Sequence, residues 1–267
     1  MPTGIGIGSA GQVFGQPLSL TARCDAQYCY EFDGATESAT ILALYDFGVN
    51  NFSISVWFKT PDVTGGGVRQ DLFATYSFTA AQTFRISLSS VGKIEFVSSG
   101  TGWIDTFSSF TPVNDTWTHV VYSVDRSGNA VWYGDYTTTQ SLNISANSTS
   151  LSGAEVTGIG GGIGASKFEG LIADVAQWDI ALTAAQVKEY YDNSKGTPKL
   201  CANTALSTAS NLQGWWRFSN PSGTYSGVMK NEGYGMVANA AAPATPVAYN
   251  FFLTNMSQSN VITDYPT

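Results

Sequence analysis

Apolar and polar residues alternate over short stretches along most of the chain. Every second residue from Phe52 to Phe58 is apolar, and the same holds from Phe84 to Leu88. Because successive side chains of a strand point to opposite faces, this period predicts half-buried strands. The segments with strand character are 28–34, 51–59, 83–89, 93–98, 116–124, 130–136, 168–178 and 212–218. Short strands separated by Gly, Asn, Asp and Ser predict an all-β, antiparallel fold of the sandwich or barrel type.

One segment, 183–191, has the pattern of a helix. It opens with Thr183 followed three residues later by Gln186, the spacing of a capping box. Gly196 and Pro198 end it. We expect this short helix to lie across the edge of the sandwich.

The flanks differ in pattern from the middle of the chain. Residues 1–20 are rich in glycine and predict an N-terminal arm, whereas 21–220 predict the β-sandwich. Residues 221–267 predict a C-terminal extension that packs on the domain or on a neighbour. Two such flanks favour self-association or assembly into a larger particle.

Composition excludes several classes of function. The chain is 43% hydrophobic, only 12% charged, and carries a net charge of −8 without any basic run. Phosphate backbones need clustered Lys and Arg, so we expect no nucleic-acid partner. No stretch approaches the roughly 18 apolar residues of a membrane span, and the N-terminus lacks the pattern of a secretory signal. We therefore expect no membrane insertion.

Few residues could carry catalysis. Retaining glycosidases need two carboxylates on one face about 5–5.5 Å apart, and Glu31, Asp33 and Glu37 come close to that spacing, but Glu37 falls beyond a turn. His119 is the sole histidine, so it serves packing rather than a Ser-His-Asp site or a His-rich metal site. We predict a non-enzymatic protein and keep a glycoside hydrolase as an alternative.

The three cysteines are an odd number, so at least one thiol has no partner within the chain. Their pairing stays open; they are Cys24, Cys29 and Cys201.

Five motifs in order, across about residues 28–218, resemble the concanavalin A-like (laminin-G-like) jelly roll. They are Tyr30–Gly34 (YEFDG), Phe52–Phe58 (FSISVWF), Thr116–Tyr122 (TWTHVVY), Phe168–Trp178 (FEGLIADVAQW) and Ala181–Tyr191 (ALTAAQVKEYY). The resemblance implies two antiparallel sheets packed face to face, with one short helix.

A narrower resemblance concerns the segment Ser210–Phe218 (SNLQGWWRF) followed by Thr254–Met256 (TNM). It is similar to laminin-G-like proteins of marine bacteriophages, which implies a virion structural, decoration or fibre protein. Such a protein assembles in the host cytoplasm, and its partners are other virion proteins. The chain departs from that pattern after Phe218, where Ser219–Pro221 replaces a Gly-Asp-rich continuation.

The jelly-roll resemblance also implies a structural Ca²⁺ ion. Asp174 occupies the place of a calcium ligand in the last long strand, and Asp33 could approach it if the two strands are neighbours. Carboxylate and carbonyl oxygens suit this ion. The alternative is that Asp174 only hydrogen-bonds a turn.

Sugar binding needs exposed aromatic faces beside amides and hydroxyls. Trp103 lies in a Gly-rich stretch and is the most loop-like tryptophan, and Tyr76, Tyr133 and Tyr136 are further candidates. The tryptophans within strand motifs, Trp57, Trp117, Trp178 and Trp216, are expected in the core.

The leading hypothesis is a virion protein with a lectin-like domain that binds host surface glycans. The alternative is a free carbohydrate-binding lectin at an extracellular surface.

Overall fold

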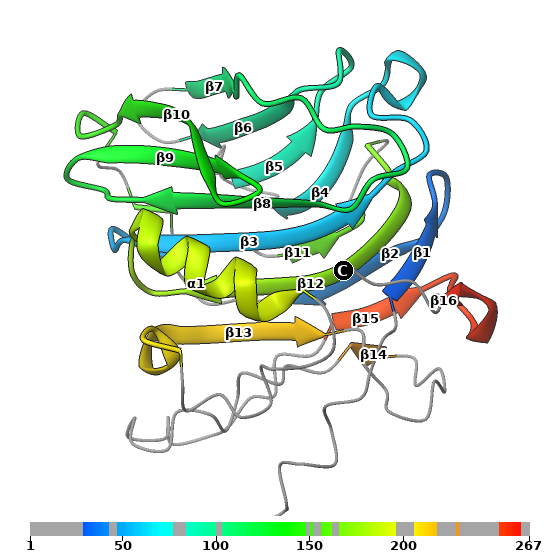
Figure 1. Cartoon of the computed structure of the whole chain (residues 1–267). Helices are drawn as coiled ribbons and strands as arrows, with labels where there is room; N and C mark the ends of the chain where they lie inside the picture. Colours follow the sequence, from blue (N-terminus) through cyan, green and yellow to red (C-terminus); the bar gives the residue numbers. More distant parts are fainter. Residues whose placement is uncertain are drawn as a thin grey trace, which may run out of the picture.

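Two antiparallel sheets pack face to face in the computed structural model, which describes residues 29–42, 47–76, 84–99, 103–147, 150–151, 156–161, 166–195, 206–217, 228–229 and 251–262. The predicted arm 1–20, Cys24 and Cys201 lie outside these residues. Figure 1 shows the two layers, with the helix across the outer face of one of them. The all-β antiparallel class predicted from the alternation is confirmed, and so is the two-sheet sandwich implied by the jelly-roll resemblance.

The first sheet has the order β10-β9-β8-β3-β12-β1-β16, and β13 also pairs with β12. Its strands are β1 (Cys29–Asp33), β3 (Phe52–Lys59), β8 (Thr118–Val124), β9 (Asn129–Gly134), β10 (Thr137–Asn143), β12 (Glu169–Trp178), β13 (Leu212–Arg217) and β16 (Val261–Ile262). Strand β12 is central: β3 runs along one side, while β1 and β13 share the other.

The second sheet has the order β14-β15-β2-β11-β4-β5-β6-β7. Its strands are β2 (Ser38–Leu42), β4 (Gln70–Tyr76), β5 (Phe84–Leu88), β6 (Ile94–Ser99), β7 (Trp103–Phe107), β11 (Val156–Ile159), β14 (Val228–Met229) and β15 (Phe251–Thr254). Strands β2, β4, β7, β10 and β11 were not predicted, because their alternation is interrupted by polar or small residues.

The core between the sheets is rich in aromatic rings. Phe84 of β5 lies at its centre, 4.9 Å from the ring of Phe96 and 5.1 Å from that of Phe52. Tyr122 of β8 stacks on Phe96 across the two layers, with centroids 3.4 Å apart. The alternating residues of β3 and β5 all point into this core, as the period-2 pattern predicts.

Helix α1 (Ala184–Ser194) covers the outer face of the first sheet, not the edge of the sandwich as expected, because Val187 and Tyr190 are buried against that face. Its capping box is formed as predicted, because Thr183 and Gln186 each accept a hydrogen bond from the other's backbone N–H. No helix in the described part of the chain is long and apolar enough to span a membrane.

Serines anchor the segment before α1 to the sheet. The Ser53 hydroxyl donates to the carbonyl of Ile180 and accepts from the N–H of Leu182, and Ser123 donates to the carbonyl of Leu182. The polar face of β3 is therefore buried and hydrogen-bonded rather than solvated.

Part of the predicted C-terminal extension joins the sheets. In Figure 1 the late strands β15 and β16, coloured orange to red, lie beside the early blue strands. Strand β15 pairs with β2 and β16 pairs with β1. The turn between them, Gln258–Asn260, thereby reaches the end of β1.

Candidate functional site

An acidic groove with a volume of about 490 Å³ opens at the end of β1. Its charged side chains are those of Glu31, Asp33, Glu37, Lys59, Asp115 and Glu169. Asn260 adds an amide, and Leu171 is among the apolar residues that line it. The groove is thus assembled from both ends of the described chain and from three neighbouring strands.

The β1–β12 register positions the carboxylates. Glu31 pairs with Leu171, and Asp33 pairs with Glu169. Glu31 and Asp33 are exposed on the outer side of the sheet, whereas Phe32 between them points into the core. Strand alternation therefore puts two carboxylates of β1 on the face where β12 contributes Glu169.

Gly170 allows β12 to pass close to the end of β3. Its φ is +131°, and a Cβ atom there would overlap the carbonyl oxygen of Lys59 and lie 2.9 Å from Cα of Thr60. The backbone of Thr60 in turn accepts a hydrogen bond from Asp115 N–H at 2.8 Å. This packing brings Lys59 and Asp115 to the groove.

Asp33 organises the turn after β1. Its Oδ1 accepts hydrogen bonds from the backbone N–H groups of Ala35, Thr36 and Glu37, and Oδ2 accepts one from the Thr36 hydroxyl. Burial acts to raise the pKa of Asp33, but these hydrogen bonds outweigh it and hold the pKa well below its usual range. The carboxylate stays charged and is held in place by the turn.

Glu37 is the most buried carboxylate of the groove, with 9% of the residue exposed. Its Oε1 accepts a hydrogen bond of 2.6 Å from Nδ2 of Asn260, which also donates to the Glu31 carbonyl. Its Oε2 is buried and has no hydrogen-bond partner among the described residues. Burial is the main cause that raises the pKa of Glu37, and the charge of Asp33 adds to it.

A half-buried tryptophan lies beside the groove. The β3–β8 register pairs Phe58 with Thr118, which places Trp117 next to Lys59. Trp117 and Leu171 pack against the same small cluster around Trp57 on the outer face of the sheet. Trp117 was predicted to be core, and the structure leaves it partly accessible.

The four predicted sugar-binding aromatics do not come together. Tyr76 ends β4, and Trp103 begins β7 rather than lying in a turn; the two strands are separated by β5 and β6. Tyr133 is 6% exposed and packs beneath α1, whereas Tyr136 is 40% exposed and has its ring 4.7 Å from that of Tyr191. Of these residues, Tyr136 alone has a described and exposed side chain.

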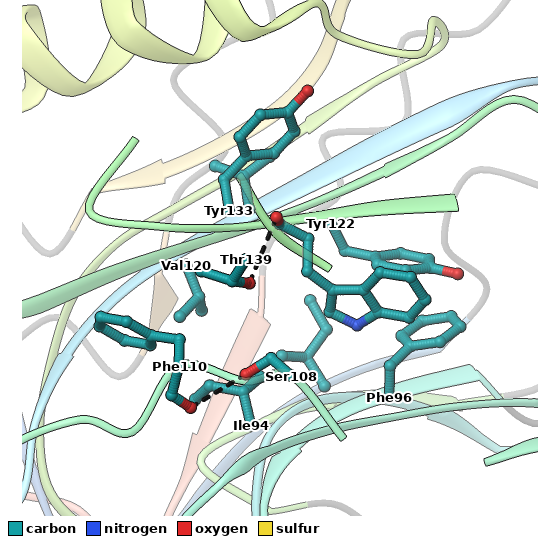
Figure 2. A pocket seen from close by; sticks show the side chains of 11 residues that line it. Ile94, Phe96, Ser108, Phe110, Val120, Tyr122, Tyr133 and Thr139 are labelled. Atoms are coloured by element: carbon teal, nitrogen blue, oxygen red, sulfur yellow. Dashed lines mark hydrogen bonds between the residues drawn. The ribbon is translucent and has the colours of Figure 1, made fainter. Parts of the chain in front are cut away.

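A small apolar pocket lies between the sheets near Tyr133. Figure 2 shows it filled by Phe96, Phe110, Tyr122 and other core side chains, with the Tyr133 ring directed away from them. Ser108 donates to the Phe110 carbonyl at 3.0 Å, and Thr139 donates to a strand carbonyl at 3.3 Å. The pocket is part of the packed core and offers no room for a sugar.

The two predicted calcium ligands lie far apart. Asp33 pairs with Glu169, five residues before Asp174 on β12, which corresponds to about 17 Å along a strand. Asp174 is fully buried, and its Oδ1 accepts the indole N–H of Trp215. Calcium ligands must lie within about 2.6 Å of one ion, so this pair does not fit a shared calcium site.

The loss of Asp174 is expected to destabilise the fold independently of calcium. Asp174→Ala leaves the buried Trp215 N–H without this acceptor, which costs about 1–3 kcal/mol. Urea denaturation should show the same loss of unfolding free energy for Asp174→Ala in the presence of calcium and in the presence of EGTA. The control Asp105→Ala replaces an exposed residue and should change the free energy of unfolding little. A fall in the melting temperature of the unmodified protein after chelation would contradict this expectation and reveal a calcium site elsewhere.

His119 is buried and packed, as predicted from the sequence. It is fully buried, stacks on Trp57 with centroids 4.7 Å apart, and has its Nε2 within 2.7 Å of the Ser55 hydroxyl. Burial lowers its pKa to about 3, so it stays neutral near pH 7. The Ser–His contact lies beneath α1 and is closed to a substrate.

The sequence did not predict the groove, because its residues are scattered from Glu31 to Asn260. In the sequence, Glu31, Asp33 and Glu37 were noted together for their near-catalytic spacing, and Asp33 as a calcium ligand, but not as parts of one groove. Nothing in the sequence shows that Glu169 lies beside Asp33 or that Asn260 lies beside Glu37, since both contacts depend on strand register.

Comparisons with known proteins agree with this architecture. A pentraxin from Limulus polyphemus, described as SAP-like and heptameric, has a TM-score of 0.50 and 15% identity over 64% of this chain and 82% of its own. A putative carbohydrate binding protein from Bacteroides ovatus has a TM-score of 0.57 and 13% identity over 89% of this chain and 59% of its own. No curated protein matches significantly.

A family model described as the concanavalin A-like lectin/glucanases superfamily matches residues 33–188. The match spans more than half of the chain and contains three of the five motifs in full. It also contains most of the strands that build the acidic groove. The chain therefore belongs to the concanavalin A-like lectin/glucanases superfamily.

Proposed function

We propose that the protein is a non-enzymatic glycan-binding domain whose binding site is the acidic groove. The groove itself carries this proposal: about 490 Å³ falls within the usual range for small-ligand sites. The exposed carboxylates can accept hydrogen bonds from sugar hydroxyls, whereas both N–H groups of Asn260 already donate to Glu31 and Glu37. Trp117 beside Lys59 supplies an aromatic face for stacking on the apolar side of a sugar ring.

Binding is favoured over hydrolysis by the state of Asp33. A glycosidase needs one carboxyl group as acid and a second as nucleophile or base. Glu37 has the raised pKa of an acid, but both oxygens of Asp33 already accept hydrogen bonds within its own turn. A reducing-sugar assay on algal polysaccharides is expected to stay blank. Sugar release that disappears in Glu37→Gln would establish a hydrolase instead.

Replacement of Trp117 tests the site. Trp117→Ala is expected to weaken glycan binding about five- to tenfold, because one aromatic–sugar stack contributes of the order of 1–1.5 kcal/mol. A glycan array followed by isothermal titration calorimetry measures this effect. Phe107→Ala is the matched control, since Phe107 is 44% exposed on the other sheet.

Two different results would contradict the proposal. No binding to any glycan on the array would refute the proposed function. Unchanged affinity in Trp117→Ala would show that the sugar does not stack on Trp117, and the exposed Tyr136 would be the next aromatic residue to replace.

We further propose that this domain belongs to a virion structural or decoration protein. The segment Ser210–Phe218, within which Leu212–Arg217 forms β13, carries the resemblance to marine phage proteins together with Thr254–Met256. The expected location is the particle, after assembly in the host cytoplasm, and the expected partners are other virion proteins or further copies. Mass spectrometry of purified particles should find the chain; its absence there would leave a free lectin at an extracellular surface.

A further inference from the structure

The acidic groove concentrates a large part of the protein's charge. Five carboxylates and one ammonium group give it a formal charge of −4, half of the net −8 of the whole chain. Such a field attracts cations and repels anions, most strongly inside a concave site. A sialylated or sulfated glycan would bind there less tightly, whereas a ligand with a positive group would bind more tightly.

Glu37 supplies a second, independent indication of a cationic donor. Its Oε2 is buried in a residue that is only 9% exposed, and no described residue donates a hydrogen bond to it. A buried carboxylate oxygen without a partner is costly, and a charged donor compensates it best. Glu37 is among the residues that line the groove, so a bound ligand lies beside this carboxylate and can provide the donor once the side chain turns Oε2 toward it.

An ammonium group fits these carboxylates better than a metal ion. Calcium needs six to eight oxygens at 2.3–2.6 Å from one point. Among the described residues no group of three His, Cys, Asp or Glu side chains is arranged to hold a metal ion. An ammonium group needs only up to three acceptors and tolerates varied directions.

We propose that the groove selects glycans that carry a free, protonated amino group, such as oligosaccharides of glucosamine. This inference rests on the proposed function and narrows its ligand class. The ammonium group donates to Glu37, and the exposed carboxylates of Glu31 and Glu169 add electrostatic attraction. Asn260 holds Glu37 in place through its other oxygen.

Isothermal titration calorimetry with three oligosaccharides of equal length tests the inference. The probes are a glucosamine oligomer, its N-acetylated form and a glucose oligomer, used below the pKa of the amine. The glucosamine oligomer is expected to bind at least tenfold more tightly than the other two. N-acetylation removes the positive charge but keeps the sugar ring, so the difference in affinity between these two probes measures the contribution of the charged amino group.

Variants locate the effect in the groove. Glu37→Gln is expected to reduce the amine preference to less than about threefold. The double variant Glu31→Gln, Glu169→Gln changes only exposed side chains, so it tests the same point if Glu37→Gln fails to fold. Asp105→Asn removes an exposed carboxylate of β7, outside the groove, and should leave the preference unchanged.

The outcomes separate the two proposals. Equal affinity for all three sugars would overturn the amine selectivity and leave glycan binding intact. If the amine preference survives both groove variants, it arises from the overall negative charge of the chain rather than from the groove. That result would overturn the inference. Absence of binding to every sugar would overturn both.

Discussion

Phe84→Ala is expected to lower the free energy of unfolding by about 3–5 kcal/mol, because it opens a cavity at the centre of the aromatic core. Phe84 is 1% exposed, and its ring lies within about 6 Å of five others. Those rings belong to Phe47, Phe52, Phe73, Phe96 and Tyr122. They come from both sheets, so the cavity cannot close by moving one strand.

Urea denaturation and a thermal melt measure this loss. The melting temperature is expected to fall by about 6–20 °C for a domain of this size. Phe107→Ala removes an equally large ring that is 44% exposed, and it should change the free energy of unfolding by no more than about 0.5 kcal/mol. Equal losses for the two variants would show that the aromatic cluster does not stabilise the fold as described.

Gly170→Ala is expected to destabilise the protein by about 2–4 kcal/mol and to disturb the acidic groove. The new Cβ would overlap the carbonyl oxygen of Lys59, and the φ of +131° is unfavourable for any residue with a side chain. Relief of the clash requires β12 to move away from β3, which shifts Glu169 relative to Lys59. Glycan binding should fall together with stability.

Gly66→Ala provides the matched control for strain without a clash. Gly66 also has a positive φ, of +64°, but a Cβ there has no heavy atom within 4 Å. Its cost is expected to be about 1 kcal/mol, the penalty of a left-handed conformation alone. If both variants lose the same stability, the close approach of β12 to β3 is not what requires glycine at position 170.

The alternation of apolar residues predicted most of the first sheet correctly. The predicted segments 51–59 and 168–178 correspond to β3 and β12 within one residue at either end. The capping box predicted where α1 begins. These signals are local, because side-chain period and a helix cap depend on residues a few positions apart.

The polar face of β3 shows where local pattern stops being informative. Ser53 and Ser55 alternate with apolar residues and were expected at a solvent-facing side, yet both are fully buried. The segment 180–182 and helix α1 cover them, and their hydroxyls bond to a backbone carbonyl and to His119. Alternation distinguishes the two faces of a strand but not what covers each face.

Local pattern was equally uninformative about the candidate binding residues. Trp103 lies in a Gly-rich stretch of sequence, yet the structure starts β7 at this residue. Asp174 matched a position expected of a calcium ligand, yet it is buried against Trp215 and about 17 Å from Asp33 along the strands.

By itself, the sequence determined the all-β antiparallel class, the inward faces of the main strands and the capped helix, because side-chain alternation and a helix cap depend on near neighbours in the chain; the two-sheet sandwich followed from the resemblance to the jelly-roll family. Only the tertiary structure decided that Glu31, Asp33, Glu37, Asp115 and Glu169 share one groove. Their proximity depends on the register of β1 with β12, on the tight passage at Gly170 and on the return of Asn260 to β1. Each of these is a contact between distant segments, which packing of the whole core selects and no local pattern encodes.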